Sequence, residues 1–375
     1  MSHFAVLVIG PNYNEQLAPY HEFECTGQVD QWVQSIDETE EARASYESET
    51  DSIIILPDGT RVAANDPQFY RDPTAEEQEK MGPFGGTGWG KGISYTSRDW
   101  GDGKGYRTKV YDATLGGGTL TEVPVKETKT FSEFCQEYYE RPVVAFGEEP
   151  DLEETHKWGW LELGAEGEVV KVVDRTNPNR KWDWYIPGGR WTGYFPLKPG
   201  ATGEVGKPGL MTEAAEPGTA DQCLWGDVDL GKARGEAAER ARETFAGWAE
   251  CLLDNPKPRP WGEVLASMPE DIDKAREVYN EQKAIASWKE KNPYSWGCPV
   301  EDLGFDEEGY VAKKRSQALV PFSIVKDGKW HQKGRMGWWG MTSDEMPEGE
   351  WETQVAALFD DLPPDTPVTM VDCHI

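Results

Sequence analysis

The chain has 375 residues, enough for one large or two ordinary domains, and a formal net charge of −30. Its 37% hydrophobic content, mean hydropathy of −0.69 and lack of an apolar run near the roughly 18 residues of a membrane span predict a soluble protein with no membrane partner. The excess of 68 acidic over 38 basic side chains repels nucleic acid, so we expect no direct DNA or RNA binding.

The amino-terminal third predicts strands and one polar helix. The continuous apolar run 4–9 is typical of a strand buried on both faces. Acidic residues that open the segment from 37 to about 47 favour a short helix. The runs 53–56 and 60–62, on either side of Asp58-Gly59, predict a β-hairpin. The glycine-rich region 83–118 predicts mainly loop.

The middle of the chain mixes both element types. A helix is predicted over 131–140, and strands over 168–174 and 190–195. The segment 196–219, rich in glycine and proline, predicts a long loop or a domain junction. Apolar residues three to four positions apart then predict a long helix over 230–252 and a second over 272–288.

The last quarter returns to strands. A hairpin is predicted from 318–325 and 329–332, a helix over 350–359 and a final strand over 368–375. Because the first and last strands are both apolar, we expect them to pair in one sheet. This order predicts an α+β fold with a mixed or antiparallel sheet and a ferredoxin-like centre. Residues 1–219 and 296–375 would form its core, with 220–295 as a helical insertion.

The segment 181–195 combines many aromatics, both charge signs and a Gly-Gly turn. We predict that it binds a ligand, because glycine lets backbone approach closely and a guanidinium can both stack on indoles and pair with an anion. We expect Arg190 to be partly buried against an indole or a carboxylate. The alternative is a structural corner with an ion pair between Asp183 and Arg190. The predicted binding residues here are Trp182, Asp183, Trp184, Tyr185, Gly188, Gly189, Arg190 and Trp191.

A second glycine-rich stretch, 85–92, nearly matches a phosphate loop. Gly92 stands where such a loop needs Ser or Thr, and no buried strand precedes it. A glycine loop that lines a cleft is the better interpretation, with Trp89 and Lys91 as binding residues.

Histidine, cysteine and carboxylates gather only near residue 21 and at the carboxyl end. His21, Cys25, Asp372 and His374 are therefore the candidate catalytic residues, as a cysteine nucleophile with a histidine base or as acid and base. A zinc site from His21, Cys25 and Cys373 or His374 is the alternative. No segment has a metal-ligand spacing, so we expect no tightly bound metal and identify no cofactor. The structural interpretation is that the cysteines are buried in the core and the histidines only form hydrogen bonds.

The six cysteines are scattered without a C-x-x-C pair, which predicts reduced thiols. The amino terminus has no basic region before its apolar run and no cleavage site after it, so we expect a cytoplasmic protein.

Several motifs resemble a family of uncharacterised tailed-bacteriophage proteins. They are the opening SHFAVLVIG, the run PYHEFECTG at 19–27, the central WDWYIPGGRW and the terminal DCHI. The resemblance spans nearly the whole chain and implies a phage accessory protein in the host cytoplasm. It implies no activity.

Three functions follow as hypotheses. The first is binding of a small anionic or nucleotide-like ligand in a cleft lined by Trp, Gly and Arg. The second is an anti-defence protein whose acidic surface binds and inhibits a basic host protein that acts in defence or handles nucleic acid. The third is an enzyme that uses the His, Cys and Asp residues.

Overall fold

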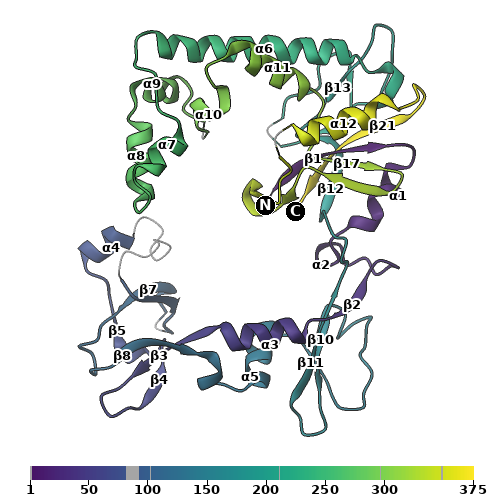
Figure 1. Ribbon diagram of the computed structural model, residues 1–375. Helices are drawn as coiled ribbons and strands as arrows, with labels where there is room; N and C mark the ends of the chain where they lie inside the picture. Colours follow the sequence, from purple (N-terminus) through teal and green to yellow (C-terminus); the bar gives the residue numbers. More distant parts are fainter. Residues whose placement is uncertain (1, 82–92, 102, 211, 296, 348) are drawn as a thin grey trace. The chain divides into compact units, whose positions relative to one another are not determined.

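The computed structural model describes residues 2–81, 93–101, 103–210, 212–295, 297–347 and 349–375. The chain forms two compact units, one of Met1–Trp32 with Asn177–Ile375 and one of Val33–Thr176. Helices occur together with sheets that contain both parallel and antiparallel pairs, so the fold is α+β as predicted (Figure 1). The predicted division into a core and a helical insertion at 220–295 stays a prediction.

The first unit is built on one mixed sheet, in the order β14-β12-β21-β1-β17-β18, with β16 also paired to β21. The two terminal strands are neighbours in this sheet and pair antiparallel along their length, which confirms the prediction. Strand β17 pairs with β1 in parallel. The ferredoxin-like centre stays a prediction. The strands are β1 His3–Ile9, β12 Trp184–Gly189, β14 Lys207–Pro208, β16 Gln222–Leu224, β17 Ser323–Lys326, β18 Lys329–Gln332 and β21 Pro367–His374.

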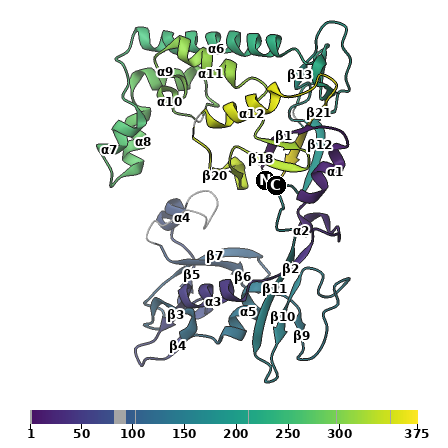
Figure 2. The same ribbon diagram turned by 45° about the vertical axis from the view of Figure 1, so that its right-hand side comes forward.

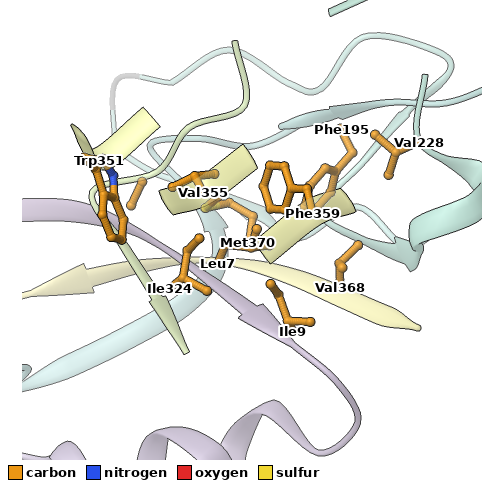
Figure 3. Packing of buried hydrophobic residues seen from close by; sticks show 11 residues of the cluster. Leu7, Ile9, Phe195, Val228, Ile324, Trp351, Val355, Phe359, Val368 and Met370 are labelled. Atoms are coloured by element: carbon orange, nitrogen blue, oxygen red, sulfur yellow. The ribbon is translucent and has the colours of Figure 1, made fainter. Parts of the chain in front are cut away.

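Both faces of β1 are buried because its side chains alternate between two cores. On one face, Leu7 and Ile9 pack with helix α12 (Glu350–Asp360). This helix supplies Trp351, Val355 and Phe359 at intervals of four residues, so they form one stripe (Figure 3).

The opposite face packs against the amino-terminal helices. Phe4, Val6 and Val8 lie with Leu17 and Trp182 in a second core. Leu17 ends helix α1 (Tyr13–Leu17), and α2 (Phe23–Thr26) follows after a short 3₁₀ turn.

A helical part of the first unit has a core of its own. Buried Phe245, Trp248 and Cys251 of α6 meet residues from α7 to α10. The predicted helix over 272–288 is wrong as a single helix, because the chain breaks between Asn280 and Lys283 into α8 and α9. The bounds are α6 Leu230–Leu253, α7 Trp261–Ala266, α8 Ile272–Asn280, α9 Lys283–Lys291, α10 Pro299–Leu303 and α11 Glu307–Ser316.

The second unit holds three small sheets, β2-β11-β10-β9, β4-β3-β8 and β5-β7-β6. The predicted hairpin at Asp58-Gly59 is confirmed as β3 and β4, and the predicted helix over 131–140 as α5. The bounds are β2 Gln34–Asp37, α3 Thr39–Ser48, β3 Thr50–Ile55, β4 Arg61–Ala63, β5 Tyr70–Arg71, α4 Ala75–Met81, β6 Tyr95–Asp99, β7 Tyr106–Tyr111, β8 Thr119–Pro124, α5 Phe131–Tyr139, β9 Val143–Val144, β10 Gly159–Leu163 and β11 Val169–Thr176.

Two predicted strands are displaced in the structure. The strand expected over 190–195 is wrong, because pairing with β21 selects 184–187 and the chain turns after Gly189. The strand expected to start at 318 begins only at Ser323. The remaining short strands of the first unit are β13 Phe195–Pro196, β15 Thr219–Ala220, β19 Arg335–Met336 and β20 Thr342–Ser343.

A buried carboxylate fixes the loop that follows β12. Asp221 is fully buried, and its Oδ1 accepts the backbone N–H groups of Gly193 at 2.8 Å and Tyr194 at 3.0 Å. Its Oδ2 accepts the N–H of Gly206 at 2.8 Å. These three bonds satisfy the buried charge and join two loop segments.

Asp221→Asn should therefore lower the free energy of unfolding of the first unit by about 2–4 kcal/mol, because the new amide places a donor against backbone donors. Urea unfolding checks this, with the exposed Asp365→Asn as the control. A loss equal to that of the control would contradict the anchoring role.

Candidate functional site

Three aromatic rings from three neighbouring strands lie in one row at the end of the main sheet. His374 of β21 is opposite His3 of β1 on one side and Trp184 of β12 on the other, so the three side chains share a face. The imidazole centroids are 4.8 Å apart at 79°. The indole stacks on His374 at 4.9 Å and 15°, and meets His3 edge-on at 5.3 Å. We call His3, His374 and Trp184 the ring row.

A carboxylate holds each imidazole of the ring row. His3 Nδ1 lies 2.8 Å from Oδ1 of Asp372, which is 1% exposed. His374 Nδ1 lies 2.8 Å from both carboxylate oxygens of Asp183. A carboxylate on Nδ1 fixes the ring and leaves Nε2 for a ligand or a proton. Across the described ranges, neither Nε2 has a hydrogen-bond partner.

The Gly188-Gly189 turn lets the chain pass directly over two buried carboxylates. Both glycines have positive φ, 80° and 57°. A Cβ on Gly188 would lie 2.8 Å from Oδ2 of Asp221, and one on Gly189 would overlap the side chain of Asp372. The close approach brings the backbone N–H of Arg190 within 2.9 Å of Asp372 Oδ2. The turn therefore places Arg190 beside the carboxylate that holds His3.

The predicted burial of Arg190 is wrong. Its side chain is exposed, and within the described ranges only its backbone N–H contacts a carboxylate. The expected ion pair with Asp183 is also replaced, because Asp183 binds His374. We expected a partner because burying an unpaired guanidinium costs its hydration. The guanidinium of Arg190 stays in water, so it needs no partner.

Other predicted binding residues of the segment 181–195 serve packing. Trp182 is buried in the core beside α1, and its Nε1 donates to the carbonyl of Leu17. Tyr185 packs on the same core, donates its hydroxyl to Asn14 Oδ1, and burial raises its pKa to about 12. Trp191 packs against the core under α12. The segment thus divides into structural aromatics and the single exposed indole of Trp184.

His21 is not part of the ring row and occupies a hydrogen-bonded structural position. It is 1% exposed. Its Nε2 lies 3.1 Å from Asp30 Oδ2 and its Nδ1 lies 3.1 Å from Thr26 Oγ1. With both nitrogens occupied, His21 has no free atom for acid–base work.

The cysteines are thiols in surroundings that disfavour a nucleophile. Partial burial and the charge of Glu22 raise the pKa of the exposed Cys25 to about 11. Burial raises the pKa of Cys373 well above its usual range. Cys373 packs in the core on the face opposite the ring row, so it does not act with His374.

Trp89 and Lys91 lie outside the described residues, as does the whole glycine stretch 85–92. Among the residues that the structure does describe, no three His, Cys, Asp or Glu side chains are grouped to hold a metal. Within the same ranges, no helix has the length and apolar character needed to cross a bilayer.

The structure adds His3 to the predicted site. It brings together Asp183, Trp184, Asp372 and His374, which the sequence suggested separately. His3 was missed, although pairing of the two terminal strands in antiparallel register is the signal that places it opposite His374.

Comparison with known proteins gives no guide to this arrangement. No family model matches the chain. No curated protein matches it, and no solved structure does. Function is therefore inferred from the residues themselves.

The raised pKa predicts slow alkylation of Cys25. At pH 8 iodoacetamide should modify it about tenfold more slowly than free cysteine, because fewer thiolates outweigh their greater nucleophilicity. The rate should rise as the pH approaches 11. Peptide mapping by mass spectrometry measures it, with Glu22→Gln expected to speed the reaction. If Cys25 reacts as fast as free cysteine, its thiol is not deactivated and it becomes a candidate nucleophile again.

Proposed function

We propose that the protein binds a small anionic ligand with an aromatic ring, such as a nucleotide, at the ring row. The observation that carries this proposal is the pair of carboxylate-held imidazoles beside an exposed indole. A protonated imidazole whose Nδ1–H donates to a carboxylate can donate its Nε2–H to a phosphate oxygen. His3 and His374 place two carboxylate-held imidazoles next to each other.

Trp184 and Arg190 supply the two other contacts that such a ligand needs. The Trp184 side chain is 41% exposed although one face stacks on His374, so part of the indole is available to a base. The Arg190 guanidinium is exposed, and it has no ion pair to any residue in the described part of the chain. Its turn is anchored on Asp372, which places it at the edge of the ring row.

General acid–base catalysis on this ligand is a second candidate function. The observation that favours it is that each imidazole has its own carboxylate while the two rings touch edge to face. One imidazole can then accept a proton while its neighbour donates one. His3 and His374 would carry this chemistry, in place of the predicted His21 and Cys25.

The sequence resemblance supports a phage accessory protein in the host cytoplasm as the setting. The net charge of −30 supports, as the remaining alternative, fast and salt-sensitive association with a basic host protein. The ring row does not depend on that alternative.

Ligand binding is tested by adding AMP, adenosine or inorganic phosphate to nitrogen-labelled protein. AMP should shift the Nε2 resonances of His3 and His374 more than adenosine or inorganic phosphate does, because AMP combines a base that stacks with a charged phosphate. Trp184→Ala should weaken AMP binding at least about fivefold. The control is Trp158→Ala, an indole of similar exposure in the second unit. Unshifted imidazole resonances at millimolar AMP would end the proposal.

Catalysis is tested separately with chromogenic phosphate mono- and diesters. If the protein turns one over, His3→Ala and His374→Ala should each lower kcat by about 10²-fold or more. His156→Ala is the matched control, since this histidine lies in the second unit with its own hydrogen bonds. Equal activity in all three variants would assign the turnover to other groups.

A further inference from the structure

A groove of about 930 Å³ lies between α6, α11 and α12 in the first unit. Figure 2 shows α11 running beside α6, with α12 below them. This volume falls in the range of sites that enclose a small molecule. The groove includes no residue of the ring row.

Each helix presents one stripe to the groove. Arg234, Ala238 and Arg242 follow at intervals of four residues on α6, and Ala312 and Ala356 line the groove from α11 and α12. The short side chains of the alanines form an apolar lining between the charged side chains. The two arginines of α6 are eight residues apart, roughly 12 Å along the helix axis.

Three arginines of the groove are unpaired. Arg234, Arg242 and Arg315 are exposed, and within the described ranges none has a hydrogen bond or ion pair from its guanidinium. Glu307, Glu308 and Glu352 line the same groove, and among the described residues none of them pairs with these arginines.

Some other cations of the same helices have partners, whereas the exposed guanidinium of Arg240 on α6 has none among the described residues. Lys232 of α6 lies 3.8 Å from Glu236, and Lys314 of α11 lies over the ring of Tyr310. In a chain with an excess of 30 negative charges, three guanidiniums without a carboxylate partner thus line one groove. Such a set of cations suits an anionic ligand.

We propose that this groove binds a nucleotide that carries two or more phosphates. The arginines pair with phosphate oxygens, for which the planar guanidinium is the best suited cation. The alanine-lined floor contacts the base, and the carboxylates of Glu307 and Glu308 accept hydrogen bonds from hydroxyl or amino groups. This site does not depend on the function proposed for the ring row. If the groove binds no nucleotide, the proposal for the ring row is unaffected.

Calorimetric titration of the full chain with ATP, AMP and inorganic pyrophosphate tests the proposal, with EDTA present to exclude metal. ATP should bind most tightly, because it alone combines several phosphates with a base. Arg234→Ala and Arg315→Ala should each weaken ATP binding about tenfold or more. Both substitutions are at exposed positions, and circular dichroism checks that the variants are folded.

Two controls make the test specific. Arg276→Ala on α8 removes the same charge from an exposed helix away from the groove and should leave ATP binding unchanged. The same titrations are repeated in a His3→Ala background, where nucleotide binding at the ring row is weakened. The loss of ATP affinity caused by Arg234→Ala should be the same in that background, which separates this groove from the ring row. The proposal is overturned if none of the three probes binds, if pyrophosphate binds as tightly as ATP, or if Arg276→Ala weakens binding as much as Arg234→Ala.

Discussion

Pairing between the two ends of the chain is the interaction on which the first unit depends. Strand β21 lies between β1 and β12 and bonds to both, so its backbone groups are satisfied only when the amino-terminal strand is in place. The same pairing closes two cores, since alternate residues of β1 face α12 on one side and α1 on the other. It also creates the ring row, because His3 and His374 come together only in this register.

Buried carboxylates connect the fold to the candidate site. Asp221 anchors the loop after β12 by accepting hydrogen bonds from backbone N–H groups. Asp372 contacts the imidazole of His3 and accepts a hydrogen bond from the backbone N–H of Arg190. A buried charge is tolerated only with such partners, so each carboxylate dictates the path of the chain around it. The two glycines of the turn are then required because Cβ atoms there would collide with these same carboxylates.

The sequence predicted what depends on local pattern. The terminal strands, α6 and the hairpin at Asp58-Gly59 follow from apolar periodicity and turn residues, and all three are found. The strand expected over 190–195 was wrong because pairing with β21, far along the chain, decides which residues of an aromatic segment form the strand. Asp183, Trp184, Asp372 and His374 were predicted as separate candidates; that they form one site with His3 depends on strand register, which local pattern does not determine.

The net charge requires any anion site in this protein to be local. An excess of 30 negative charges repels anions at long range, but exposed charges are screened over roughly 10 Å at 0.1 M salt. Anion binding is therefore favoured most by direct contact with cations that no carboxylate already neutralises. Arg71 illustrates the opposite case, since it pairs with both Glu77 and Asp112. Among the described residues, Arg190 beside the ring row and the three arginines of the groove have no carboxylate partner, which supports these two places, rather than the acidic surface as a whole, as the proposed ligand sites.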